Sequence, residues 1–122
     1  MRDYTKIEAW KLADDFAVAV YEATNEFPRE EIYGITSQVR RSATSVAANI
    51  VEGSARESLK DYLQFLQIAR GSLSETQYFL HLSTRLGYLS NEASVDLMVL
   101  AKRTFACLHG LAKSVRAESS RP

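Results

Sequence analysis

Apolar residues recur every three or four positions through nearly the whole chain, and this spacing constrains the fold more than any other feature. In the first stretch, six residues follow it and so share one face of an α-helix, namely Trp10, Ala13, Ala17, Val20, Tyr21 and Thr24. No stretch alternates apolar and polar residues with the period of two that a half-buried strand requires. The sequence therefore predicts an all-α fold.

Breaker and capping residues divide this pattern into four helices. Proline at Phe27-Pro28 ends the first helix, because its ring cannot continue the hydrogen-bond ladder. Gly53 suits a left-handed C-cap for the second helix, and the other candidate caps are Gly87, Ser58 and Ser90. The predicted helices run over residues 7–25, from Ile35 to Gly53, from Leu59 up to Gly87, and from Ser90 to a polar tail at residues 118–122.

The short connections between these helices imply that neighbours are antiparallel, which gives an up-and-down four-helix bundle. The 122 residues fit a single domain, residues 1–122, and a chain of that size buries roughly two-thirds of its unfolded surface. One cysteine, Cys107, cannot form an internal disulfide. Charges interrupt every apolar run before the ~20 residues that a membrane span needs, and no export signal is visible, so we expect a soluble, cytoplasmic protein.

The charges sum to zero but are unevenly spread. With 15 basic and 15 acidic residues and a pI of about 6.7, the chain lacks the high pI, above about 9, of domains that coat nucleic acid through bulk charge. The first predicted helix is rich in acids, whereas the last is basic. If the chain contacts nucleic acid, the candidate residues are Lys102, Arg103, Lys113 and Arg116.

The second predicted helix carries a polar stripe beside its apolar one. Its members follow at steps of three or four residues and are Gln38, Arg41, Ser45, Asn49, Glu52 and Arg56. Such a stripe is either a solvated outer face or a partly buried polar seam. The helix contains no lysine, although lysine and glutamate usually fill solvated faces, so we favour the seam.

The third predicted helix offers a complement to this stripe in Gln64, Gln67, Gly71, Ser72 and Glu75. Glycine inside a helix costs about 1 kcal/mol relative to alanine, so Gly71 predicts a close approach of another backbone, against the alternative of a tolerated exposed glycine. If the two stripes meet, Glu75 is the expected partner of Arg41.

No constellation for catalysis is visible. A di-iron bundle needs Glu-x-x-His on two helices, and no Glu or Asp here has a histidine three residues later. Phosphate-binding glycine loops are also missing. We interpret His81, His109 and Cys107 as ordinary packing or surface residues, and we expect no metal, no cofactor and no enzymatic activity.

Several motifs together resemble a bacterial family. They are Phe27-Pro28, Tyr33-Gly34, Arg40-Arg41, the run Asn49-Ile50-Val51-Glu52-Gly53 with Arg56, and Gly71-Ser72 with Glu75. The family comprises the small four-helix-bundle proteins encoded in intervening sequences of large-subunit ribosomal RNA genes, together with their free-standing relatives. The resemblance spans nearly the whole chain. Val51 and Ile35 depart conservatively from the usual alanine and leucine.

The resemblance implies a left-handed bundle that assembles into a ring, with a pentamer as the implied size, and no known enzymatic activity. The family is also similar to accessory proteins of diversity-generating retroelements, which form barrels of five bundles and are thought to engage nucleic acid and a reverse transcriptase. The polar signature that the resemblance carries over is Gln38, Arg41, Asn49, Glu52, Arg56, Ser72 and Glu75. These residues would hold the ring together or line its interior.

Two functional hypotheses follow. The first is a non-enzymatic homo-oligomer that binds RNA, a ribonucleoprotein or a nucleic-acid enzyme through the basic residues of the last helix. The second is a protein–protein scaffold with no nucleic-acid role, which the neutral net charge favours. The sequence leaves open the ring size, the ligand, and whether the polar stripe is an interface, a ring interior or a solvated face.

Overall fold

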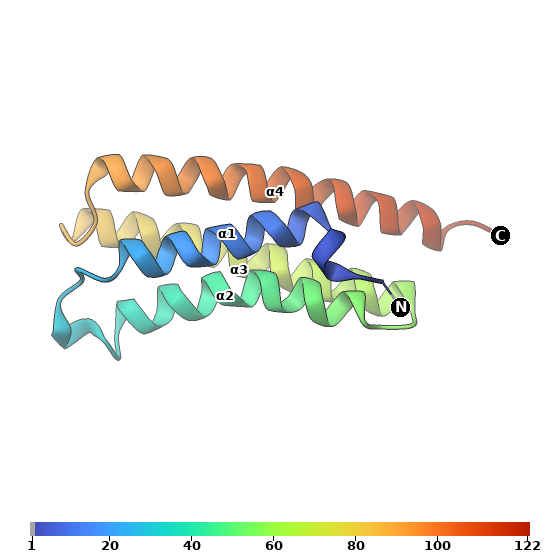
Figure 1. Ribbon diagram of the computed structural model, residues 1–122, viewed down its shortest axis with the longest axis horizontal. Helices are drawn as coiled ribbons and strands as arrows, with labels where there is room; N and C mark the ends of the chain where they lie inside the picture. Colours follow the sequence, from blue (N-terminus) through green and yellow to red (C-terminus); the bar gives the residue numbers. More distant parts are fainter. Residues whose placement is uncertain (1) are drawn as a thin grey trace.

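A computed structural model describes residues 2–122 as four helices with no strand among them (Figure 1). The helices are α1 (Glu8–Ala23), α2 (Ile35–Ser54), α3 (Leu59–Arg85) and α4 (Asn91–Ser119), with short 3-10 helices η1 (Tyr4–Lys6) and η2 (Arg29–Glu31). Successive helices run in opposite directions in Figure 1, and α4 packs back against α1. The predicted all-α, up-and-down four-helix bundle is confirmed.

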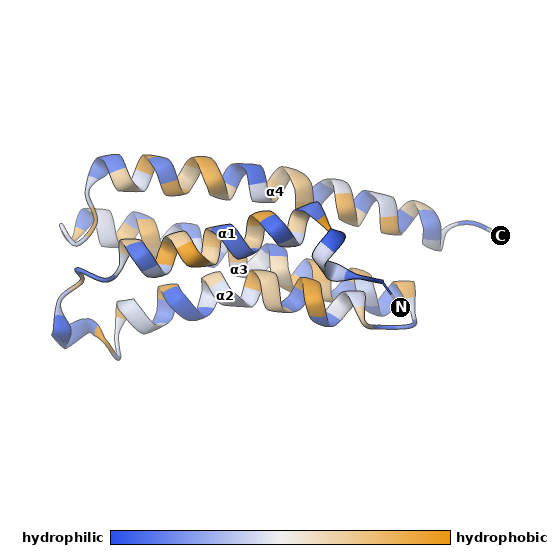
Figure 2. Ribbon diagram, in the orientation of Figure 1, coloured by the Kyte–Doolittle hydropathy of each residue, from blue (hydrophilic) through white to orange (hydrophobic). Residues whose placement is uncertain are grey.

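The helices form a shorter and a longer pair, as the predicted ranges do. α1 and α2 have 16 and 20 residues, whereas α3 and α4 have 27 and 29. α4 extends to Ser119, into the segment expected as a polar tail, and Figure 1 shows its last turns passing beyond the first turn of α1. Polar and apolar residues are interspersed along every helix in Figure 2, and none of the described helices is long and apolar enough to cross a membrane.

The core lies where the apolar spacing predicts it. The α2 residues Val39, Ala43, Val46 and Ile50 are all fully buried, and burying a side chain such as Ile50 contributes about 1.5–3 kcal/mol. The first predicted stripe is less exact, because Tyr21 is 45% exposed. Its ring lies under the Arg40 guanidinium, 4.6 Å from ring centroid to Cζ, instead of inside the core.

The predicted serine and glycine caps are confirmed at both ends of the α3–α4 connection. The Ser90 side chain accepts a hydrogen bond from the Ala93 amide at the start of α4. At the start of α3, the Ser58 side chain accepts one from the Asp61 amide. Gly87 has a φ of +79°, which glycine adopts without steric cost. The Tyr88 amide then reaches the Ser83 carbonyl at 2.9 Å and the Gly87 amide reaches Thr84 at 3.1 Å, the pattern of a Schellman motif.

The role predicted for Gly53 is wrong, and no backbone among residues 2–122 approaches Gly71 closely. Gly53 is not a left-handed cap, because α2 continues through it to Ser54 and Gly87 is the sole positive-φ residue described. A Cβ at Gly53 would lie 2.8 Å from Phe65 Cβ and 3.0 Å from Tyr62 Cδ1, so this glycine permits the close approach of α2 and α3. A Cβ at Gly71 would meet nothing within 4 Å.

Glu31 ties the α1–α2 connector to the α3–α4 connection at the same end of the bundle. Its carboxylate accepts a hydrogen bond of 2.9 Å from the Tyr88 hydroxyl and occupies the space where a side chain at Gly34 would lie, just before α2. Because the hydrogen bond holds the proton on the phenol, it raises the pKa of Tyr88 above its usual value of 10.0. A carboxylate beside the first turn of α2 also complements the helix dipole there.

Candidate functional site

The predicted polar stripe lies along the contact between α2 and α3, and it is layered. Its inner members, Ser45, Asn49 and Ser72, are half-buried. Its outer members are exposed to solvent, namely Gln38, Arg41, Glu52, Arg56 and Glu75. The stripe is therefore a half-buried seam of small polar groups with a solvated charged rim.

Short side chains in this seam are hydrogen-bonded to one another. Ser45 Oγ and Ser72 Oγ are 2.9 Å apart across the two helices, and the Asn49 amide donates to Ser45 Oγ at 2.9 Å. Deeper in the contact, the Thr76 hydroxyl lies 2.8 Å from Ser42 Oγ. Thr76 and Ser42 were not singled out from the sequence, although both continue the seam at helical spacing. Because each hydroxyl of the seam has a partner, the network fixes the register of α2 against α3.

The charged rim surrounds an open hollow but does not form the predicted ion pair. The hollow has a volume of about 340 Å³ and is lined by Gln38, Arg41, Ser42, Ser45, Ser72 and Glu75. The salt bridges among residues 2–122 are Glu8–Lys11 and Glu52–Arg56, so Arg41 and Glu75 border one cavity without pairing. Both are exposed, and water screens their attraction.

Arg40, the neighbour of Arg41, makes the contacts between helices. Its Nε donates to Thr24 Oγ1 at 2.8 Å, and its guanidinium lies over the Tyr21 ring. Thr24 is 2% exposed, so this bond closes the buried end of α1 against α2. The sequence pointed to Arg41 because it shares the polar stripe, whereas the contact with α1 depends on the adjacent position, about 100° around the helix.

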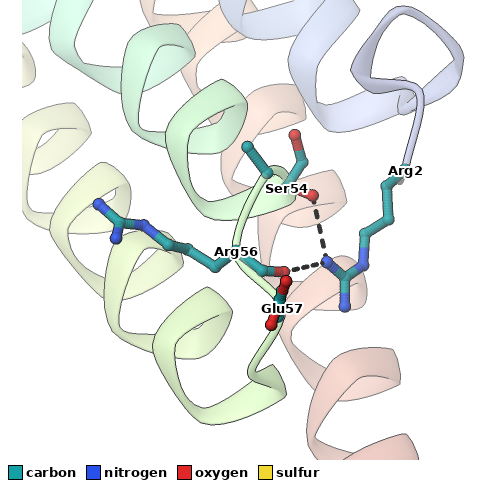
Figure 3. A pocket seen from close by; sticks show the side chains of 5 residues that line it. Arg2, Ser54, Arg56 and Glu57 are labelled. Carbon is teal, nitrogen blue, oxygen red and sulfur yellow. Dashed lines mark hydrogen bonds between the residues drawn. The ribbon is translucent and has the colours of Figure 1, made fainter.

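At the other end of the seam, two arginines close the corner between α2 and α3. Arg56 donates to Glu52 at 2.6 Å and lies over the Phe65 ring. The Arg2 guanidinium donates to the carbonyl oxygens of Ser54 at 3.1 Å and Arg56 at 2.7 Å. A pocket at this corner is lined by Arg2 and residues 54–57. Figure 3 shows the Arg56 side chain pointing away from the pocket, whereas Arg2 points into it. Arg2 thus satisfies carbonyls that the end of α2 leaves open.

Arg2 also shields the tyrosine beneath this corner. Its guanidinium lies 4.6 Å from the centroid of the Tyr62 ring. Burial raises the pKa of Tyr62 above 10.0, and the nearby positive charge of Arg2 partly offsets that rise. Nothing in the sequence pattern indicated these contacts, because Arg2 precedes the first helix and acts at residues more than 50 positions away.

The four basic candidates on α4 are all exposed but do not share one face. Lys102 and Lys113 are eleven residues apart, which brings them within about 20° of each other around the helix. Arg103 is turned by about 100° from Lys102 and so lies apart from them. Arg116 borders a groove between α3 and α4 that the sequence did not indicate.

This α3–α4 groove combines an apolar floor with a basic rim. It encloses about 180 Å³, and its lining comprises Leu66, Gln67, Arg70, Phe105, Leu108, His109, Ala112 and Arg116. Gln67 was predicted to complement the α2 stripe but faces α4 instead. The lining contains no acidic residue, and no hydrogen bond or salt bridge occupies the guanidinium of Arg70 or Arg116 within residues 2–122.

The remaining reactive side chains do not converge. Cys107 is half-buried, and His81 is exposed beside the Tyr78 ring. In the part of the chain that the structure describes, no three His, Cys, Asp or Glu side chains gather as metal ligands would. Among the tyrosines near helix ends, Tyr33 is 95% exposed, whereas the Tyr88 hydroxyl donates a hydrogen bond to Glu31.

These features define a small antiparallel bundle whose second and third helices are joined by a polar seam. The model of the 23S rRNA-intervening sequence protein family matches residues 5–110. The chain belongs to this family, as the motifs around Asn49 and Gly71 indicated. The comparison with curated proteins gives no match.

A solved structure supports the same assignment. The chain is similar to a crystal structure of a protein of unknown function from the S23 ribosomal protein family of Bacteroides thetaiotaomicron VPI-5482. The TM-score is 0.76 and the sequence identity 26%, over 86% of this chain and 98% of the other. The likeness therefore extends over almost the entire bundle of that protein.

Proposed function

We propose that this chain is a non-catalytic module that assembles into a homo-oligomer and binds RNA, alone or with a ribonucleoprotein partner. The observation that carries the RNA-binding part is the charge of α4. Between residues 97 and 117 the helix has four exposed basic side chains and no acidic one, although the whole chain is neutral. Exposed lysine and arginine contact phosphates and position a protein on nucleic acid.

The outer faces of α1 and α4 support self-association. On α1, Val18 is 52% exposed and lies among the exposed acids Asp14, Asp15 and Glu22. On α4, Val95 and Val99 are more than half exposed. The exposed acids Glu92 and Asp96 lie beside them, and the basic side chains of the helix begin at Lys102. An acidic face and a basic face on one chain complement each other head to tail, and such contacts close into rings when the rotation permits. A pentamer is the ring size that the family resemblance implies.

Light scattering tests the assembly. We expect a mass several times 13.7 kDa that falls as salt rises, because salt screens the charges that join the copies. A monomer at micromolar concentration and low salt would refute the oligomer.

A titration tests RNA binding. We expect the assembly to bind labelled structured and unstructured RNA at low salt, and Lys113→Ala with Arg116→Ala to weaken both similarly. For single strands, the slope of log affinity against log salt should fall by about 0.7 for each phosphate that the variant no longer neutralises. Lys6→Ala with Lys60→Ala, which removes two exposed lysines outside α4, is the matched control. If the unmodified protein binds no RNA at micromolar concentration, the protein scaffold replaces this function.

A further inference from the structure

We propose that the α3–α4 groove receives one unpaired nucleotide of an RNA strand, with the base on its apolar floor and the adjoining phosphates on Arg70 and Arg116. The inference rests on the proposed RNA binding and states where on the bundle an unpaired base of the RNA would bind. It goes beyond the exposed lysines, because a groove with a floor can distinguish an unpaired base from a phosphate backbone alone.

The chemistry of the groove points to a ligand with two parts. Its floor is apolar and includes the half-buried ring of Phe105, whereas its rim carries two arginines, one from each helix. A simple anion would leave the floor unused, and an aliphatic ligand would leave the arginines unused. An unpaired nucleotide uses both, because its base stacks on aromatic rings or guanidinium planes and its phosphate accepts the paired donors of arginine.

The charge of the lining favours RNA over a protein ligand. The groove contains no acidic side chain that a lysine or arginine of a partner could pair with. Lys113 is exposed and lies one helical turn before Arg116, so a strand leaving the groove can continue along exposed positive charge. One strand that crosses the groove and then passes Lys113 would contact the arginines of the groove and the exposed lysine of α4 together.

The size of the groove distinguishes a strand from a free nucleotide. Pockets that bury a whole small molecule measure roughly 300–1,000 Å³, and this groove encloses about 180 Å³. It therefore fits one unit of a longer ligand, whose other units bind elsewhere and raise the effective concentration of the first.

The test compares a labelled single-stranded RNA with the same strand carrying abasic positions, titrated into the full-length assembly. We expect the intact strand to bind about tenfold more tightly, because an abasic position has no base to stack on the Phe105 ring. Phe105→Leu should remove most of this preference, and Arg70→Ala should weaken both strands. The control for Phe105→Leu is Phe79→Leu, which changes a half-buried phenylalanine of α3 outside the groove. The control for Arg70→Ala is Arg85→Ala, which removes another exposed arginine of α3.

The outcomes separate this inference from the proposed function. If Lys113→Ala with Arg116→Ala weakens RNA binding while Phe105→Leu and Arg70→Ala bind like the unmodified protein, the groove assignment is wrong and the proposed function stands. If no RNA binds, both are wrong. Two competition results would also overturn the assignment. In the first, micromolar uridine monophosphate displaces the strand, which means that the groove holds a free nucleotide. In the second, an aspartate-rich peptide displaces the strand as effectively as RNA does, which means that the groove does not distinguish RNA from an acidic peptide. A 4-thiouridine strand that crosslinks next to Phe105 would support it directly.

Discussion

The contact between α2 and α3 is close at Gly53 and pairs its inner polar side chains, and the charged rim of its hollow has both signs. The hollow between α3 and α4 differs, because its floor is apolar and the charges on its rim are all positive. In the first, Gly53 admits the Phe65 side chain and hydroxyls bond across the helices. In the second, Arg70 and Arg116 border an apolar floor. The inner polar groups of the first contact are used to specify the fold, whereas the arginines of the second remain available for a ligand.

The largest expected effect concerns the tightness of the α2–α3 contact. Gly53→Ala should lower the free energy of unfolding by about 1–3 kcal/mol, because its Cβ would overlap the side chains of Phe65 and Tyr62. Gly71→Ala is the matched control and should raise it by roughly 0.5–1 kcal/mol, since it gains helix propensity in open space. Urea unfolding followed by circular dichroism, at matched protein concentrations, measures both. Equal losses would show that Gly71 also faces a close neighbour, such as another copy.

A second comparison sets a paired hydroxyl against an unpaired arginine. Thr76→Val should cost about 1–2 kcal/mol in the same unfolding measurement, because Thr76 is fully buried and its hydroxyl bonds to Ser42 and to the Ser72 carbonyl. Arg70→Ala should change the free energy of unfolding by less than about 0.5 kcal/mol, as expected for an exposed side chain. A large loss for Arg70→Ala would mean that the groove is part of the stabilising core and would weaken its assignment to a ligand.

The smallest expected effect tests the rim of the seam. Arg40→Ala should cost about 1 kcal/mol, because it removes the bond to Thr24 and the contact with the Tyr21 ring. Arg41→Ala should cost less than about 0.5 kcal/mol for the folded chain, since Arg41 is exposed and unpaired with Glu75. This order reverses what the polar stripe suggested. If Arg41→Ala instead dissociates the oligomer in light scattering, the rim belongs to an interface between copies.

The sequence predicted three helix ends correctly from local signals, although the cap expected at Gly53 was wrong. Serine side chains at Ser58 and Ser90 cap the helices that follow them, and Gly87 closes α3. Capping depends on residues within one turn, so spacing along the chain is enough to find it. The same reasoning found the inner residues of the seam, because positions three or four apart must share a face.

Spacing failed where the answer depended on which helix lies opposite. It assigned the close approach to Gly71 instead of Gly53, and it paired Arg41 with Glu75 although Arg40 makes the contacts. A stripe shows which residues share a face but does not show how far away the neighbouring backbone lies. The hydrogen bonds of Arg2 to the end of α2 join residues more than 50 positions apart, so spacing along the chain could not predict them.

By itself, the sequence determined the class of fold, the four helices, their core faces and the family, because periodicity, caps and motifs are properties of neighbouring residues. Tertiary structure decided which glycine is crowded, which arginine is paired, and that α3 and α4 leave a basic groove between them. The physical reason is that hydrogen bonds and steric overlap change over a few tenths of an ångström. Such distances between helices are fixed only when the whole bundle packs.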